Sequence, residues 1–215
     1  MILFDGSGFE YNALIEKIGN REVVLEITRK RRGSLPKINI TLYQSLIKKD
    51  KMEWVVEKAT ELGVSKIVPI VSDRSEKKGF NVERARKITI EASEQCGRAD
   101  VPELIDITSL DEALEKCKNI IIFDKSGEGM NYEKEKNILV HNSYPTNRNS
   151  ICILIGPEGG WSPRELQMFK QKSRLHGDGI SGGIKICSLG PLTLRAETAS
   201  VVALTLIGVG GGVDL

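Results

Sequence analysis

The sequence predicts an α/β protein whose parallel sheet is covered by helices on both faces. Between residues 37 and 207, short apolar segments alternate with helical segments. The apolar segments 119–124 and 151–155 are nearly continuous, as in parallel strands that are buried on both faces. This alternation favours a parallel sheet with crossover helices. The chain of 215 residues is long enough to bury a sizeable core, in one large domain or in a small and a medium one.

Composition and charge narrow the class of protein. Hydrophobic residues make up 40% and charged residues 28%, which is ordinary for a globular protein. The net charge of +2, from 31 basic and 29 acidic residues, neither indicates nor excludes a local nucleic-acid surface. No apolar run approaches the roughly 18–20 residues that span a bilayer. Asp5 follows directly after Met1–Phe4, so no signal peptide is expected and a cytoplasmic location is predicted.

The cysteines and histidines suggest no metal site. The four cysteines are widely spaced without a C-x-x-C pair, and neither His141 nor His176 has a cysteine at ligand spacing. We therefore expect no zinc site and no disulfide framework. Cys152 lies in an apolar run, where a buried inert thiol is favoured over a catalytic Cys–His pair.

The N-terminal residues predict a β-hairpin. Residues 8–18 and 21–29 are expected to form two strands joined at Gly19-Asn20, because apolar and polar residues alternate in the second. Such a hairpin is marginal alone and must pack on something. The basic run of residues 29–33 either contacts phosphates or forms a solvated turn. Residues 34–36 form a plausible linker.

The α/β region begins with a strand that contains Ile38, Ile40 and Leu42. The apolar spacing then predicts a helix over residues 52–62, with Gly63 at its C-cap position. A strand over residues 66–71 contains Pro69, so its pairing should be interrupted or at an edge.

The remaining elements follow in order. Asn81 is the expected N-cap of a helix over residues 81–96. The other expected elements are a short helix (111–117), a strand (119–124) leading into a loop (125–129), a polar connection (126–150), a strand (151–155), a helix that starts with the capping box of residues 162–165, a helix (193–207) and a loose tail (208–215).

Two glycine-containing loops are the most informative stretches, at residues 154–161 and 189–200. Each looks like a strand end, a tight loop and a helix start. Glycine allows close approach of a ligand to the main chain, and helix starts leave N–H groups unpaired, which suits a nucleoside-type ligand. Neither loop has the Walker or the G-x-G-x-x-G pattern. The alternative is that both are ordinary connections.

Together the two loops resemble the knot loops of SPOUT methyltransferases and, among these, the RsmE family, which methylates N3 of a uridine in 16S ribosomal RNA. The resemblance is collinear over nearly the whole chain. It includes residues 4–8 (FDGSG), 51–64 (KMEWVVEKATELGV), 72–75 (SDRS) and 91–98 (EASEQCGR).

This resemblance implies a SPOUT-type parallel sheet with a C-terminal trefoil knot, preceded by a small PUA-like β-barrel. Residues 1–36 would be a partial, RNA-binding PUA-like domain, and residues 37–215 the methyltransferase domain. Relatives carry additional residues before the segment at Phe4, so the barrel would lack its first strands. Residues 172–185 also look longer and more glycine-rich than in relatives, and we expect a flexible excursion there, outside the site.

The resemblance also implies S-adenosylmethionine (SAM) as cofactor, the small ribosomal subunit as partner and a homodimer. The adenosyl group is expected to lie against the main chain of Leu154, Gly156, Gly159, Leu189, Gly190 and Leu194. Lys51, Arg74 and Arg98 are expected to contact RNA.

The chemistry points to Arg195 and Glu197 as catalytic residues. N3 of uridine is a poor nucleophile while protonated, so the enzyme must help remove the proton or stabilise the anion. Arg195 is expected to stabilise negative charge on the uracil or to grip a phosphate. Glu197 would hold Arg195 or accept a proton, and the alternative is a purely structural Arg–Glu pair.

Three other functions remain open from the sequence. The first is a non-catalytic RNA-binding or ribosome-assembly factor, and the second a SPOUT enzyme that acts on transfer RNA. The third is an unrelated doubly wound nucleotide-binding enzyme, which would bind ATP or NAD in place of SAM.

Overall fold

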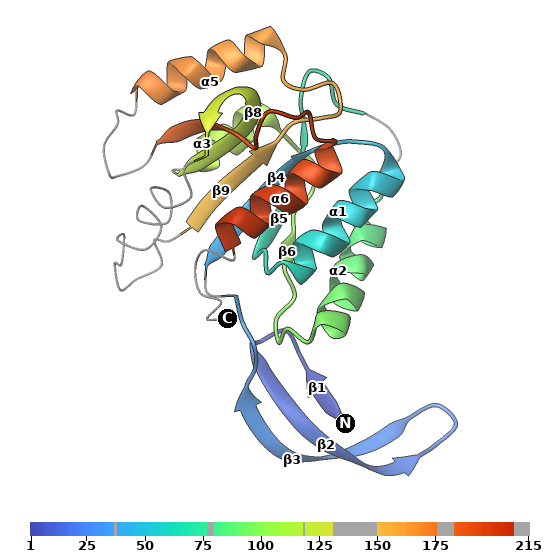
Figure 1. The fold of residues 1–215 in the computed structure, drawn as a ribbon. Helices are drawn as coiled ribbons and strands as arrows, with labels where there is room; N and C mark the ends of the chain where they lie inside the picture. Colours follow the sequence, from blue (N-terminus) through green and yellow to red (C-terminus); the bar gives the residue numbers. More distant parts are fainter. Residues whose placement is uncertain (37, 77–79, 118, 131–149, 176–182, 209–215) are drawn as a thin grey trace.

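The computed structural model describes residues 1–36, 38–76, 80–117, 119–130, 150–175 and 183–208. They form a three-stranded antiparallel sheet at the N-terminus and a seven-stranded parallel sheet in the rest of the chain (Figure 1). None of the described helices is long and apolar enough to cross a membrane. Both histidines lie outside the described residues, as do the glycine-rich residues 176–182 and most of the polar connection.

The N-terminal sheet contains the predicted hairpin. Its strands are β1 (Ile2–Phe4), β2 (Phe9–Ile18) and β3 (Val23–Arg32). The basic run was expected to follow the hairpin, but it lies within β3, where Arg32 pairs with Phe9 and Arg29 with Asn12. Of the two alternatives for this run, phosphate contact or a solvated turn, the turn is wrong, because β2 is long enough to pair with residues 29–32.

The parallel sheet has the strand order β10-β8-β9-β4-β5-β6, with β7 also paired to β5. Every pairing in it is parallel. Its strands are β4 (Asn39–Ser45), β5 (Lys66–Val71), β6 (Glu103–Leu104), β7 (Thr108–Ser109), β8 (Ile120–Gly129), β9 (Ser150–Ile155) and β10 (Ile184–Ser188).

Helices cover both faces of this sheet, as predicted (Figure 1). The helices α1 (Lys49–Glu61), α2 (Val82–Cys96) and α6 (Ala196–Gly208) pack on one face, and α3 (Leu110–Lys116) and α5 (Pro163–Leu175) on the other. Side chains of β9 alternate between the two faces: Ile151, Ile153 and Ile155 join the first core, Cys152 and Leu154 the second. The continuous apolar run of β9 follows from this double burial.

Local signals at two elements are confirmed. The Asn81 side chain accepts the Arg84 N–H at 3.0 Å and so caps α2. On one side of β5, β6 pairs with Lys66 and Ile67 while β7 pairs with Ile70 and Val71. The break falls beside Pro69, which has no N–H to donate to a ladder.

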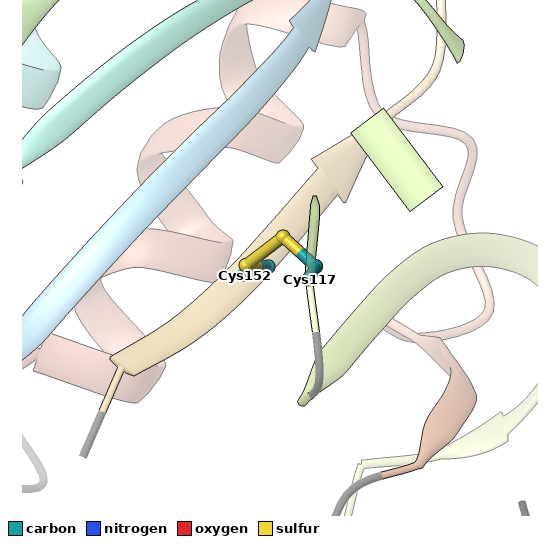
Figure 2. The surroundings of a disulfide bond; sticks show 2 residues. All are labelled: Cys117 and Cys152. Carbon is teal, nitrogen blue, oxygen red and sulfur yellow. A yellow bond between two sulfur atoms is a disulfide. The ribbon is translucent and has the colours of Figure 1, made fainter. Parts of the chain in front are cut away.

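The cysteines depart from the sequence prediction. Cys117 and Cys152 form a disulfide, with Cα atoms 6.3 Å apart, that ties the end of α3 to β9 (Figure 2). The expectation of no disulfide, and of a free thiol at Cys152, was therefore wrong. The cause is topological: β8 and β9 are neighbours, and the Cys152 N–H donates to the Asn119 carbonyl at 2.9 Å, which brings Cys117 alongside. The spacing of cysteines in the sequence does not reveal that two strands separated by a long connection become neighbours in the sheet.

The two sheets meet at a close backbone junction. The Gly8 N–H donates to the Ala99 carbonyl at 3.1 Å, and the Ala99 N–H donates to the Ser34 carbonyl at 3.0 Å. A Cβ placed on Gly33 would lie 2.1 Å from the Ala99 Cβ, so only glycine allows this approach.

Candidate active site

A cavity of about 290 Å³ opens where β8, β9 and β10 reach their carboxyl ends. This is the edge at which open α/β sheets bind ligands. Its walls come from residues 123–125 of β8, from the last residue of β9 and the loop after it (155–161), from the last residue of β10 and the loop after it (188–190 and 192–194), and from Ala196 and Ala199 of α6. The structure thus brings both glycine-containing loops to one cavity.

Trp161 holds the first loop in place. The indole N–H donates to the Phe123 carbonyl at 3.1 Å, and the ring packs edge-on against Phe169. A Cβ on Gly156 would lie 3.1 Å from the indole, so this position is tightly packed. At the other end of the loop, Gly160 has φ +66° and donates its N–H to the Pro157 carbonyl at 2.8 Å.

The second loop turns at Gly190, whose φ of +121° is a conformation that side chains rarely adopt. The Ser188 hydroxyl accepts the Gly190 N–H at 3.3 Å and donates to the Gly190 carbonyl at 3.1 Å. Leu192, with 76% of its surface exposed, stands at the rim of the cavity. Since no core contact explains it, Leu192 is available to a partner molecule.

Five of the six expected cofactor residues line the cavity: Gly156, Gly159, Leu189, Gly190 and Leu194. Leu154 is not among the lining residues, and its side chain is fully buried in the core on the α3–α5 face. A Cβ on Gly159 would meet the Arg74 side chain at 3.5 Å. That distance is an ordinary van der Waals contact, so the Arg74 side chain lies directly against the loop at residue 159.

The expected catalytic residues lie just beyond the cavity, at the start of α6. The Arg195 side chain is exposed and makes no ion pair with another described residue. Glu197 is 8% exposed, and its carboxylate lies 3.5 Å from the Lys51 ammonium. Glu197 was expected to hold Arg195 or to accept a proton. In the structure it pairs with Lys51, which was expected to contact RNA.

The other two expected RNA contacts, Arg98 and Arg74, donate hydrogen bonds to main-chain carbonyls. Arg98 is 6% exposed and donates from one guanidinium nitrogen to the carbonyls of Thr60 and Val64, at 2.9 and 3.0 Å. It also forms a two-pronged ion pair with Asp100. We therefore reinterpret Arg98 as a structural residue. Arg74 is exposed, but it donates to the Gly159 carbonyl at 2.9 Å and the Trp161 carbonyl at 3.4 Å.

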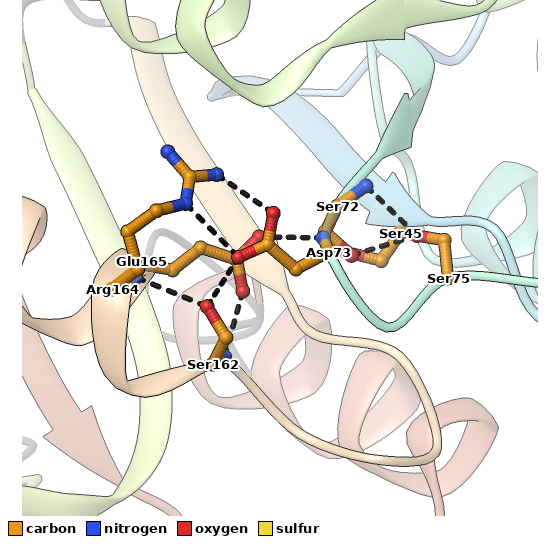
Figure 3. A network of polar contacts seen from close by, with 7 residues as sticks. All are labelled: Ser45, Ser72, Asp73, Ser75, Ser162, Arg164 and Glu165. Atoms are coloured by element: carbon orange, nitrogen blue, oxygen red, sulfur yellow. Dashed lines mark hydrogen bonds and ion pairs between the residues drawn. The ribbon is translucent and has the colours of Figure 1, made fainter.

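The predicted capping box at α5 is confirmed and extends further than the sequence suggested. The Ser162 hydroxyl accepts the Glu165 N–H at 3.2 Å, and Glu165 accepts the Ser162 N–H at 2.7 Å. The second Glu165 oxygen accepts the Asp73 N–H at 2.8 Å, and the Asp73 carboxylate accepts bonds from Ser162 and Arg164 (Figure 3). This ion pair raises the pKa of Arg164 above its usual value. Sequence spacing showed the cap but not its partner some ninety positions away.

The wall from β8 was predicted as a loop over residues 125–129. In the structure β8 runs on to Gly129, but its pairing with β10 jumps from Ile122 to Glu128. Asp124 and Lys125 lie in this irregular part and line the cavity. Within the described ranges, no three His, Cys, Asp or Glu side chains gather as they would around a metal ion.

Comparisons with known proteins agree with this geometry. Residues 34–208 match the RNA methyltransferase domain family. Ribosomal RNA small subunit methyltransferase E of Rickettsia conorii is 30% identical over 205 residues, which cover 95% of this chain and 78% of the relative. The enzyme of the same name from Aquifex aeolicus is 32% identical, over 92% of this chain and 80% of the relative.

Solved structures show the same fold. The Neisseria gonorrhoeae ribosomal RNA small subunit methyltransferase E, bound to S-adenosyl methionine, superposes with a TM-score of 0.77 at 28% identity, over 96% of this chain and 81% of that one. A Legionella pneumophila protein in complex with SAM gives a TM-score of 0.76 at 29% identity, over the same shares. This chain therefore belongs to the RNA methyltransferases of the ribosomal RNA small subunit methyltransferase E family.

Proposed function

We propose that the protein transfers a methyl group from SAM to N3 of a uridine in 16S ribosomal RNA of the small subunit. The observation that carries this proposal is the single cavity that both glycine-containing loops form at the carboxyl ends of the parallel strands. Relatives that share this fold are named as small-subunit ribosomal RNA methyltransferases, and two were solved with SAM. The uridine and its N3 atom come from the resemblance of the sequence motifs.

The cavity suits an adenosyl group in shape and chemistry. Its volume of about 290 Å³ lies near the lower end for ligand pockets. A Cβ on Gly160 or Gly190 would meet no protein atom within 4 Å, so at both glycines the main chain faces open space that a ligand can enter. Main-chain edges of the two loops would read the base and ribose, while Leu189 and Leu194 supply apolar contact. SAM itself supplies an electrophilic methyl group on a sulfonium.

Arg195 and Lys51, at the start of α6 and beside it, are the cations that we place next to the uracil. As N3 loses its proton, negative charge spreads onto the uracil oxygens, and the exposed Arg195 guanidinium would stabilise it. The N3 lone pair then forms the new N–CH₃ bond while the S–CH₃ bond breaks and its electrons stay on sulfur. Glu197, paired with Lys51 at 3.5 Å, would fix that lysine beside α6 or take the N3 proton.

A homodimer is part of the proposal. Helix α6 is apolar around most of its circumference, and Val201, Val202 and Leu206 are only partly covered in one chain. A helix that is hydrophobic all round is normally buried. A second copy packed on α6 would cover these side chains. The trefoil knot, and a PUA-like RNA-binding role for residues 1–36 ahead of the methyltransferase domain, belong to the same proposal.

Two experiments test the function. Calorimetric titration should show saturable binding of SAM but not of ATP or NAD, and Gly190→Val should abolish it, because a side chain there is strained and enters the cavity. Small subunits that lack the modification should then gain 3-methyluridine on incubation with protein and SAM, as measured by nucleoside mass spectrometry. A folded protein that binds ATP or NAD instead of SAM would refute the proposal.

A further inference from the structure

We infer that Arg74 is a positioning residue for the cofactor loop, and not an RNA contact. The inference rests on the proposed function, since it assumes that residues 156–161 bind SAM. Arg74 lies in the loop after β5, outside the cavity and behind its first wall.

The hydrogen bonds that the Arg74 guanidinium donates go to that wall. Its Nη1 donates to the Gly159 carbonyl at 2.9 Å and to the Trp161 carbonyl at 3.4 Å. These two carbonyls flank Gly160, the residue with φ +66°. One charged group therefore holds both sides of the turn that the positive φ creates.

The glycine at residue 159 shows which side of the loop faces Arg74. A Cβ built there would lie 3.5 Å from both Cβ and Cδ of Arg74, so the stem of the arginine packs along the loop. Residues 156–160 also line the cavity. The loop is thus a thin wall with the cofactor space on one side and the Arg74 side chain on the other.

The position of Arg74 is itself fixed by its neighbour. The Asp73 N–H donates to the fully buried Glu165 at 2.8 Å, and the Asp73 carboxylate binds Ser162 and Arg164 at the start of α5 (Figure 3). On the other side, the Ser72 N–H donates to the Ser75 hydroxyl at 2.9 Å. Residues 72–75 therefore form a rigid bracket, and Arg74 extends from it to the cofactor loop.

The hydrogen bonds from Arg74 should strengthen SAM binding, because they hold the main chain of the cofactor loop in place. A main-chain wall reads an adenosyl group only if its N–H and C=O groups stay within hydrogen-bond reach. Without Arg74, the carbonyls of Gly159 and Trp161 lose the charged donor that holds them. The loop would then have to be ordered by the cofactor itself, which weakens the measured affinity.

The test compares SAM and RNA binding in three variants and the parent protein, by calorimetry for SAM and filter binding for a small-subunit RNA fragment. Arg74→Ala should weaken SAM binding about tenfold, since charged hydrogen bonds that are partly exposed contribute at the lower end of their range. RNA affinity should stay within about twofold, and Arg74→Lys should recover part of the SAM affinity.

Arg86→Ala is the matched control, because it removes a partly exposed arginine whose ion-pair partners, Glu83 and Asp106, belong neither to the bracket nor to the cofactor loop. It should leave SAM affinity within about twofold. Loss of RNA binding with intact SAM binding in Arg74→Ala would overturn the inference, as would equal losses of SAM affinity in Arg74→Ala and Arg86→Ala. If the parent protein does not bind SAM at all, the proposed function fails; if the parent and Arg74→Ala bind SAM equally, only the role of Arg74 fails.

Discussion

The two sheets of this protein contrast in what their side chains do. In β9 every residue after Ser150 is buried, whereas in β2 and β3 Ala13 is the only buried residue. The parallel sheet buries its side chains in two cores and exposes main-chain groups at the carboxyl ends of its strands. The antiparallel sheet is held by its backbone ladder and leaves its side chains to solvent or to a partner molecule.

The exposed side chains of the hairpin fall into two zones. Towards its tip they include the apolar residues Ile15, Ile18 and Val23, each more than half exposed, among charged residues. Towards the junction they are basic, and Lys30 lies over the rings of Phe9 and Tyr11, 4.2 and 5.4 Å from their centroids. Aromatic and basic side chains combine well on RNA, so phosphate contact by this zone remains our prediction.

The largest expected effect tests the chemistry assigned to the parallel sheet. Arg195→Ala should lower kcat by about 100- to 1000-fold, the usual loss when one donor to a developing anion is removed. SAM affinity should change little, because Arg195 lies outside the cavity. Single-turnover methylation and calorimetry measure the two quantities, with Arg195→Lys as the control that keeps the charge. Equal losses in both would assign Arg195 to cofactor binding instead.

The next largest effect tests the junction between the two sheets. Arg98→Ala should destabilise the protein by about 3 kcal/mol, because it leaves two buried carbonyls and Asp100 without their cationic partner. For a chain of this size that corresponds to a melting temperature lower by about 6–12 °C, measured by calorimetry. Arg98→Lys should recover only part, since an ammonium cannot reproduce the fork. An unchanged melting temperature with lost RNA binding would restore the RNA role.

A smaller effect tests the antiparallel sheet. Arg29 and Arg32 make no ion pair with another described residue, whereas Arg31 pairs with Glu10 at 2.7 Å. The double variant Arg29→Ala/Arg32→Ala should weaken RNA binding and reduce the slope of log affinity against log salt by about 2. SAM affinity and melting temperature should stay unchanged. A salt slope equal to that of the parent protein would show that this zone does not touch phosphate.

Much of the fold could be predicted because its signals are local. Continuous apolar runs marked β8 and β9, helical spacing marked α1, and Asn81 and Ser162 marked the starts of α2 and α5. The extension of β3 over the basic run could not be predicted, since strand length there depends on the partner strand β2. The Cys117–Cys152 disulfide depends in the same way on which strands become neighbours.

The site was less predictable than the fold for a related reason. Glycine and helix-start signals located both loops, and the structure brings them to one cavity. The roles of charged side chains depend on distant partners: Glu197 meets Lys51, Arg98 meets the end of α1, and Arg74 meets Gly159. The sequence does not distinguish a charged residue that contacts a ligand from one that holds a neighbouring loop in place.

The smallest effect concerns the free thiols, all of which lie in the α/β region. Cys96 is exposed, whereas Cys187 is buried, and burial raises its thiol pKa, with Glu128 adding to the effect and Lys185 opposing it. Since the thiolate is the nucleophile, a raised pKa keeps Cys187 unreactive at pH 8, and its reactivity should grow only as the pH rises towards that pKa. Iodoacetamide should therefore modify Cys96 alone in the native protein, as measured by intact mass, and Cys96→Ser should take up none.

Unfolding without reductant should add Cys187, and reduction should add Cys117 and Cys152, giving four modified residues. Four reactive thiols in the unfolded, unreduced protein would contradict the disulfide. That result would not bear on the cavity, because Cys152 belongs to the core on the α3–α5 face and is not among the residues that line the cavity. In this sheet the same strand, β9, thus carries a cross-link within the core and leads into the first glycine-containing loop at its end, and the two can be tested separately.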